Sequence, residues 1–398
     1  MTTKTKILTA LFIASMMSAC CPCNRSSLRF SPPTSKSFPL LEISGSHHDI
    51  GYAIGSVFKR EIQMVFSKRN NWFQRLKKFA DQHPDNPDRL YRIQAETHYP
   101  ELMEELQGMS TGAEVPFRDL FLLNIHAELT TLMRACSKDE STGCSTIYWL
   151  SDQKKLLFHN EDGHQAYQNL MFMIKATLPS GTTILTLTYP GFLMGNGPAI
   201  NSHGIFQTTN FISAGECRIG IPRYVLGRAV LESKSLEEAI SIVTRPERGY
   251  PYHHNLGSVR TGKMYSVEVT PDGFQVIEPG HLYVHTNHLV LDRTRSFPQD
   301  RGYIISSSMS RYSVISETLN TINHSREIKI RDIHDILSSH KRAPYSPCRH
   351  PSGPVRGATL ATAVIDSIKG TMSVYRGKPC YSIRNQNLTV YSLGKPGG

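Results

Sequence analysis

Several patterns that would mark common classes of function are absent from this sequence. The formal net charge is +11, but the Lys and Arg residues are scattered and no recognisable nucleic-acid-binding motif accompanies them, so we expect no nucleic-acid partner. There is no CxxC…CxxC pair and no HExxH, so a zinc site has little support. Beyond the N-terminus no apolar run approaches the roughly 20 residues that span a bilayer, so we expect a soluble body.

The N-terminus itself has the pattern of a targeting segment. Two lysines precede the apolar stretch ILTALFIASMM, and small residues lead to Cys20. The pattern is similar to a bacterial lipobox, with Met17 in place of the more usual Leu. It predicts a signal peptide over residues 1–19, a lipid on Cys20 and a Pro/Ser-rich tether over residues 20–40. We therefore expect a membrane-anchored lipoprotein on the periplasmic or surface side of a bacterial envelope; an ordinary cleaved signal peptide is the alternative.

Cysteines are too sparse in the body for a disulfide scaffold. Eight occur in the chain, and three of them belong to the tether. An exported compartment permits disulfides, and Cys348 could pair with Cys380, but the sequence does not pair them.

The sequence pattern changes from helical to β-rich at Cys144. Residues 41–135 are mostly helical in pattern, with a break expected over Gly108–Pro116. From Cys144 onward, short β-rich stretches alternate with turns, and helices are expected at 306–323 and 331–340. This order predicts an α+β fold with helical layers around a large central sheet region.

Cys144 stands directly after a glycine and at the start of the first predicted strand. A buried structural cysteine is the commoner reading of such a position. As a nucleophile it would need a base, and seventeen histidines give no basis for choosing one. A cut between Gly143 and Cys144 would solve this problem, because the new α-amine could act as the base. Gly143 would help, since it tolerates backbone conformations that other residues avoid.

Seven motifs in order carry a resemblance to a known family. They run from about Leu41 to about Ser382 and read GSHHDIGYAIG, ELMEELQGMSTGAEVPFRDLFLLNIHAEL, GCST, FHNEDG, HTNH, SSMSRY and CRH. Together they resemble the acyl-CoA:6-aminopenicillanic acid acyltransferase family, the autoproteolytic cysteine members of the N-terminal-nucleophile hydrolases. The resemblance implies a four-layer αββα sandwich, in which residues 41–143 become an α chain and residues 144–398 the catalytic β chain of the same domain. The two chains are expected to remain associated after the cut.

The resemblance also assigns roles to single residues. Cys144 matches the nucleophile, and Asp162 in HNEDG matches an acidic residue that holds the α-amine. Asn287 in HTNH matches the side-chain amide of an oxyanion hole. Arg349 in CRH is expected to bind a substrate carboxylate. The plain alternatives are a turn residue for Asp162, a turn-capping amide for Asn287 and a surface arginine for Arg349.

These assignments predict a hydrolase that acts on linear amides without a metal or an organic cofactor. The expected substrate is a small-molecule or peptide amide, such as an acyl-amino acid or an acyl-amine. Gly163 stands where the family often has an aromatic residue, and acyl-CoA is scarce outside the cell, so water is the expected acceptor. The alternatives are an acyltransferase that uses an amine acceptor and a surface lipoprotein that only binds. A papain-like protease is disfavoured because the sequence lacks CGSCW.

Overall fold

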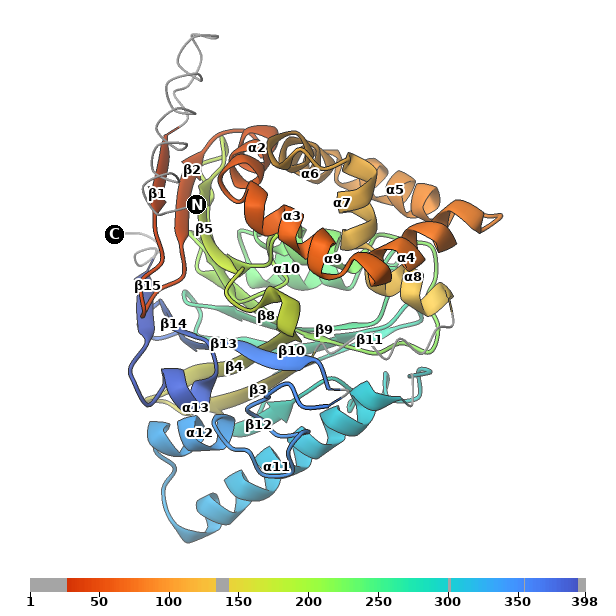
Figure 1. The fold of residues 1–398 in the computed structure, drawn as a ribbon. Helices are drawn as coiled ribbons and strands as arrows, with labels where there is room; N and C mark the ends of the chain where they lie inside the picture. The colour runs from red at the N-terminus through yellow and green to blue at the C-terminus, as the bar shows by residue number, and fades with distance from the viewer. Residues whose placement is uncertain (1–26, 134–142, 300–301, 354, 393–398) are drawn as a thin grey trace.

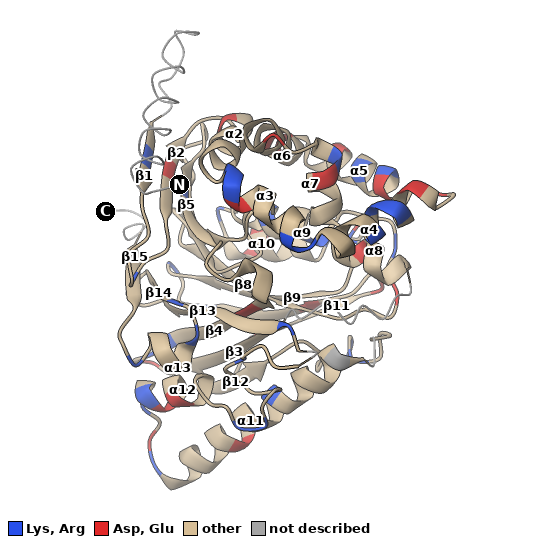
Figure 2. Cartoon of the chain, in the orientation of Figure 1, with Lys and Arg blue, Asp and Glu red and all other residues tan. Residues whose placement is uncertain are grey.

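The computed structural model describes residues 27–133, 143–299, 302–353 and 355–392. Two β-sheets face each other at the centre, and helices cover the outer face of each sheet (Figure 1). The predicted αββα sandwich is therefore confirmed. In Figure 2, Lys and Arg lie on both outer helical layers with Asp and Glu between them. Within the described residues, no helix is both long enough and apolar enough to cross a membrane.

The larger sheet has nine strands: β1 (Leu28–Ser31), β2 (Leu40–Ser44), β5 (Phe172–Thr177), β6 (Thr183–Thr188), β7 (Ala199–Asn201), β8 (Ile205–Phe211), β9 (Tyr252–Ser258), β10 (Met264–Val269) and β11 (Phe274–Ile277). They are hydrogen-bonded in that order. Among the described pairs of neighbouring strands, only β2 and β5 are parallel. β1 lies inside the segment expected to be an unpacked tether, so the folded body begins before residue 41.

The smaller sheet has six strands, in the spatial order β12 (Leu282–His285), β3 (Gly143–Leu150), β4 (Lys155–His164), β13 (Gly357–Asp366), β14 (Thr371–Arg376) and β15 (Leu388–Ser392). Side chains of β3 alternate between the two faces of the sheet. Ile147 and Trp149 pack in an apolar cluster with α11 (Tyr303–Ser325) and α12 (Ile330–Leu337). Tyr148 joins the main core on the other face. Cys144 has the same parity as Tyr148 and so faces the nine-stranded sheet.

Helices cover the outside of both sheets. Those on the nine-stranded side are α2 (His47–Val57), α3 (Lys59–Lys68), α4 (Asn70–Gln82), α5 (Pro87–His98), α6 (Pro100–Ala113), α7 (Phe117–Asn124), α8 (His126–Leu132), α9 (Arg223–Val230) and α10 (Leu236–Val243). With α11 and α12, the short helix α13 (Pro379–Ser382) covers the six-stranded side. The side chain of Ser46 caps α2 by accepting from the backbone N–H of Asp49, which fixes the start of the first helix.

The break expected over Gly108–Pro116 lies at the end of that range, because α6 continues through Gly108 to Ala113 and α7 begins at Phe117. Glycines instead bring α2 and α6 into backbone contact. The four are Gly51 and Gly55 of α2 and Gly108 and Gly112 of α6. A Cβ on Gly51 would lie 1.8 Å from the backbone oxygen of Glu105, and one on Gly108 would lie 2.1 Å from that of His48. Glycine is unfavourable within a helix, but here the absence of a Cβ lets the two helix backbones approach closely.

We expect Gly51→Ala to lower the free energy of unfolding by about 3 kcal/mol, because the added methyl group forces the two helices apart. Chemical denaturation of the purified variant measures this change. Gly273→Ala is the matched control, since a Cβ at Gly273 meets no described atom within 4 Å. Equal losses in the two variants would show that the helix contact does not require glycine.

Candidate active site

The hairpin of β3 and β4 places Cys144 between the two sheets. In its antiparallel register Cys144 lies opposite Glu161, and Gly143 lies opposite Asp162. Residues directly opposite each other point to the same face, and the Sγ atom of Cys144 is 4.0 Å from Oε1 of Glu161. The Cys144 residue is only 6% exposed. On the other side of β4, the pairing with β13 contains a β-bulge opposite Glu161 and Asp162, which bends the strand beside the cysteine.

Two buried side chains hold the backbone of Cys144. Its N–H donates to Oδ1 of Asn287 over 2.8 Å. Its carbonyl oxygen accepts from Nη1 of Arg311, a residue of α11, over 2.5 Å. Arg311 also donates to Oδ1 of Asn287 over 2.6 Å and to the hydroxyl of Ser145 over 2.9 Å. Because Arg311, Asn287 and Ser145 are all fully buried, water does not compete for these bonds, and the backbone here is rigidly placed.

Gly143 is enclosed by the same groups. A Cβ at this position would lie 2.7 Å from Nη1 of Arg349 and 3.0 Å from Nη2 of Arg311. It would also lie 3.3 Å from Oδ1 of Asn287. Any larger residue would have to displace buried, hydrogen-bonded side chains. The reason for glycine here is therefore the space beside the two guanidinium groups.

Asp162 is a buried carboxyl group next to this backbone. Its Oδ1 accepts from the hydroxyl of Thr359 over 2.6 Å. Its Oδ2 lies 4.0 Å from Nη1 of Arg349. Burial raises the pKa of Asp162 to about 6, although Arg349 and Arg311 act to lower it. Asp162 lies within β4, so the alternative of a turn residue is wrong.

Arg349, which is expected to bind a substrate carboxylate, lies beside a carboxyl group of the protein itself. Its guanidinium faces Asp162, and the residue is fully buried rather than on the surface. Its backbone N–H donates to the hydroxyl of Thr359 over 2.9 Å, which fixes the loop that carries it. Arg349 is absent from the described residues that line the cavity beside Cys144. Its position behind Gly143 suits it to hold Asp162 in place.

Asn287 lies next to Cys144, but its amide is oriented differently from the expectation. Oδ1, not Nδ2, faces the backbone nitrogen of Cys144, because both Cys144 and Arg311 donate to it. Nδ2 donates one hydrogen to the carbonyl oxygen of Phe211 over 2.8 Å. A side-chain amide has a second N–H. An oxyanion contact would have to use that second hydrogen.

Glu161 is a site residue that the sequence reading missed. Its Oε1 accepts from the hydroxyl of Tyr189 over 2.6 Å, and its Oε2 lies 3.2 Å from Nε2 of His159. Nδ1 of His159 is in turn 2.9 Å from the hydroxyl of Thr146. The signal was present in the sequence, since a short hairpin centred on residues 151–154 places Glu161 directly across from Cys144.

The environment of Cys144 favours the neutral form of its thiol. Burial raises the pKa of the Cys144 thiol well above its usual value, and the carboxyl groups of Glu161 and Asp162 add to this effect. Cys144, His159 and Glu161 also lie close enough to hold a metal ion jointly. Hydrogen bonds to Tyr189 and Thr146 already engage the glutamate and the histidine. A thiol so placed needs a nearby base before it can attack a carbonyl group.

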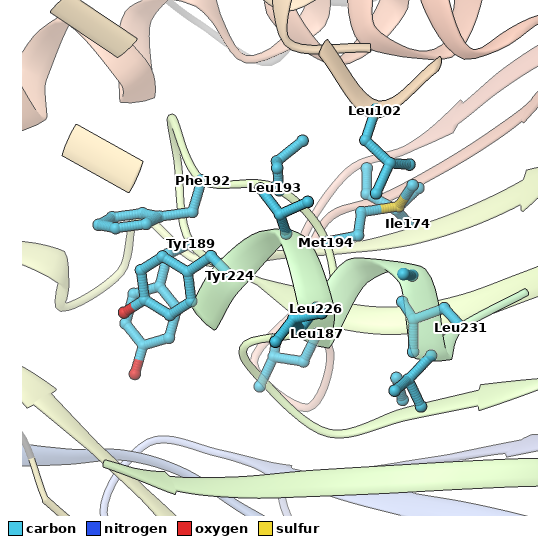
Figure 3. Close-up of a cluster of buried hydrophobic side chains, with 14 of the residues drawn as sticks. Leu102, Ile174, Leu187, Tyr189, Phe192, Leu193, Met194, Tyr224, Leu226 and Leu231 are labelled. Carbon is cyan, nitrogen blue, oxygen red and sulfur yellow. The ribbon is translucent and has the colours of Figure 1, made fainter. Parts of the chain in front are cut away.

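A cavity of about 50 Å³ opens beside Cys144. Six aromatic residues contribute to its wall: Tyr167, Tyr189, Phe192, Phe211, Tyr224 and Tyr252. Figure 3 shows Tyr189, Phe192 and Tyr224 together at one end of a buried apolar cluster. Arg69 and His126 also contribute to the wall. Burial and the nearby Arg223 and Arg69 lower the pKa of His126 well below its usual value, so the positive charge there comes from arginine and not from His126.

Comparisons with known proteins agree with this description. A family model described as "Acyl-coenzyme A:6-aminopenicillanic acid acyl-transferase" matches residues 149–381. The chain is 26% identical over 376 residues to a beta-alanyl-dopamine/carcinine hydrolase of Drosophila melanogaster, covering 87% of this chain and 95% of that one. It is 24% identical over 340 residues to an acyl-coenzyme A:6-aminopenicillanic-acid-acyltransferase of Emericella nidulans, covering 84% and 91% of the two chains.

Among solved structures, a mutant conjugated bile acid hydrolase from Clostridium perfringens matches 64% of this chain and 94% of its own, with 13% sequence identity and a TM-score of 0.37. The family model covers more than half of the chain, and both relatives align along most of it. The chain therefore belongs to the acyl-coenzyme A:6-aminopenicillanic acid acyl-transferase family.

Proposed function

We propose that this protein cuts its own chain between Gly143 and Cys144 and then uses Cys144 to hydrolyse linear amides. The observation that carries the proposal is the position of the backbone nitrogen of Cys144, 2.8 Å from Oδ1 of the fully buried Asn287. In an uncut chain this contact only orients a peptide bond. After a cut it would hold a free α-amine beside the thiol of the same residue, where the amine can serve as a base.

The cut would proceed by an N-to-S acyl shift. The Cys144 sulfur attacks the carbonyl carbon of Gly143, the C–N bond breaks, and the thiol proton passes to the departing nitrogen. Water then hydrolyses the thioester, so that Gly143 gains a carboxylate and Cys144 regains its thiol. The enclosure of Gly143 by Arg349 and Arg311 supports this step, because it restricts the movement of the residue whose peptide bond would break.

Substrate turnover would reuse the same groups. The Cys144 thiolate attacks the amide carbonyl, and the α-ammonium gives a proton to the leaving amine. Water that the same amine deprotonates then releases the acid. Asn287 holds the amine through Oδ1, and its second N–H is the side-chain donor that could meet the developing oxyanion. Asp162 contributes negative charge beside the ammonium, with Arg349 holding it in place.

The cavity wall supports an acyl-amine or acyl-amino acid substrate with an apolar or aromatic part. Six Phe and Tyr side chains provide apolar contact surface, and Arg69 adds one positive charge. The Drosophila relative is a hydrolase of amine conjugates by its name. Water as acceptor fits an exported protein, because acyl-CoA is scarce outside the cell. We include in the proposal the lipoprotein signal over residues 1–19 and the lipid on Cys20, both of which lie outside the described residues.

Acyl transfer to an amine is the second candidate, and the name of the family and of the Emericella relative favours it. The two reactions share the thioester on Cys144 and differ only in what attacks it. Incubation of the cut protein with an acyl-amine and a competing amine separates them. Free acid as the main product supports hydrolysis, whereas the new amide supports transfer.

We expect purified wild-type protein to give two pieces by intact mass, one ending at Gly143 and one beginning at Cys144. Cys144→Ala should remain a single chain, because it lacks the attacking sulfur. Cys217→Ala is the matched control and should be cut like the wild type, since Cys217 is half-buried and lies outside the cavity wall. A wild-type chain that stays whole would contradict self-cleavage and favour a lipoprotein that only binds.

We expect the rate of self-cleavage to fall as the pH drops through about 6. The pKa of Asp162 is raised from its ordinary value to about 6 by burial, so the carboxylate is present above that pH and is lost below it. Uncut chain refolded from denaturant at a series of pH values gives the rates by gel analysis. Asp162→Asn should be slow throughout and lack this acid limb. An identical acid limb in the variant would exclude Asp162 as its source.

We expect Arg311→Lys to slow self-cleavage by roughly 10- to 100-fold. Lysine keeps the charge but cannot bridge the carbonyl oxygen of Cys144 and Oδ1 of Asn287 at once. Gel analysis of refolded chain gives the rate, and circular dichroism checks the fold. Arg331→Lys is the matched control, because the Arg331 side chain is 89% exposed. Wild-type rates in Arg311→Lys would mean that this backbone contact does not assist the cut.

A further inference from the structure

A second group of reactive side chains lies in the layer that covers the six-stranded sheet. His340, Cys348 and His350 come from the loop after α12, and Cys380 comes from α13. One ligand atom of each residue lies within 4.8 Å of the others. A zinc site had little support in the sequence because no familiar spacing was present. The fold nevertheless brings the four residues together, because Cys380 lies beside His350, which is 30 residues earlier in the chain.

The distances within the group suit a tetrahedral metal ion. Nε2 of His350 lies 3.6 Å from Sγ of Cys348 and 3.4 Å from Sγ of Cys380. Around a tetrahedral zinc ion, with Zn–S of about 2.3 Å and Zn–N of about 2.0 Å, sulfur and nitrogen ligands lie roughly 3.5 Å apart. The rings of His340 and His350 are perpendicular, with their centroids 4.8 Å apart. Both imidazoles can therefore approach one point without stacking.

We propose that His340, Cys348, His350 and Cys380 form a structural zinc site. Two thiolates and two imidazoles bind zinc well, whereas calcium, magnesium and manganese prefer oxygen ligands. On binding, the two thiols release their protons to solvent, and the two thiolates balance the charge of the ion. Four protein ligands fill the tetrahedral shell, so the site has no open position for catalysis.

The ion would fix the loop that delivers Arg349 to the active site. Cys348 directly precedes Arg349, whose guanidinium lies beside Gly143 and Asp162. The same loop is already tied to β4, where the side chain of Asn160 donates to the carbonyl oxygen of Pro347 over 3.0 Å. None of the four ligands is among the described residues of the cavity wall. The site would therefore position Arg349 and would not contact substrate.

A disulfide between Cys348 and Cys380 is the rival use of these sulfurs. Both are free thiols in the structure. A disulfide would bring the sulfurs to about 2.05 Å and would leave the two histidines without a role. The observed arrangement instead has Nε2 of His350 at nearly equal distances from both sulfurs. This symmetry favours a shared ion.

The test uses full-length protein carrying Cys144→Ala, which removes the cysteine of the active site. After reduction and removal of metal by a chelator, Co²⁺ is added as a visible probe. One equivalent should bind with the ligand-field absorption of a tetrahedral sulfur–nitrogen site, and Zn²⁺ should displace it. Cys348→Ser and Cys380→Ser should each lose this absorption, whereas Cys217→Ser, the matched control, should keep it. His340→Ala alters an exposed side chain, so the fold should survive while Co²⁺ binds at least tenfold more weakly.

Zinc should also raise the thermal midpoint of the reduced Cys144→Ala protein but not that of its Cys348→Ser form. Failure of the reduced Cys144→Ala protein to bind Co²⁺ would overturn the proposal. So would unchanged binding in Cys348→Ser and Cys380→Ser. A Cys348–Cys380 disulfide found by mapping, with no Co²⁺ binding after its reduction, would assign the pair to the rival structure.

Discussion

The antiparallel register of β3 and β4 is the constraint on which the site depends. It sets Cys144 opposite Glu161 and Gly143 opposite Asp162. A slip of one residue would turn the thiol toward α11 and away from the cavity, because successive side chains of a strand point to opposite faces. The apolar residues of β3 prevent that slip. Ile147 and Trp149 would have to leave their cluster with α11 and α12 and enter the space between the sheets.

Part of that space is occupied by a network of polar side chains. Thr146, His159, Asn210 and His253 link β3, β4, β8 and β9 through side-chain hydrogen bonds of 2.9 to 3.1 Å. Such groups are costly to bury unless they are paired. When they are paired, they fix the relative position of the two sheets more sharply than apolar contacts do. This hydrogen-bonded network therefore holds in place the strands that carry the charged groups around Gly143.

The sequence predicted more of the architecture than of the site. Helix periodicity and β-rich texture located most of the elements, and the family motifs identified Cys144, Asp162, Asn287 and Arg349, which the fold does bring together. The strand β9 gives no β-rich signal, because its sequence, YHHNLGS, is largely polar. It is nevertheless fully buried, since its polar groups belong to the network between the sheets.

The contacts that the motif residues make with one another could not be predicted from the sequence. Arg311 lies in a quoted motif, SSMSRY, but nothing in that string shows that its guanidinium reaches the backbone of Cys144. Contacts of this kind span more than 160 residues of chain. They follow from the packing of α11 on the six-stranded sheet, which local patterns do not encode.

The strands β1 and β2 have a consequence for how the protein can be assembled. They precede α2–α8 in the chain, yet they complete the edge of the nine-stranded sheet, with β2 parallel to β5. Glu105 of α6 also forms a buried ion pair with Arg228 of α9. A molecule cut at Gly143 would thus share one sheet and one core between two polypeptides. The two pieces would have to meet before they refold, so their refolding would become slower on dilution. The half-time for refolding of the uncut chain does not depend on protein concentration. The two pieces would then reach their packed arrangement because the chain folds before it is cut. The separated, denatured pieces would not readily regain that arrangement at low concentration.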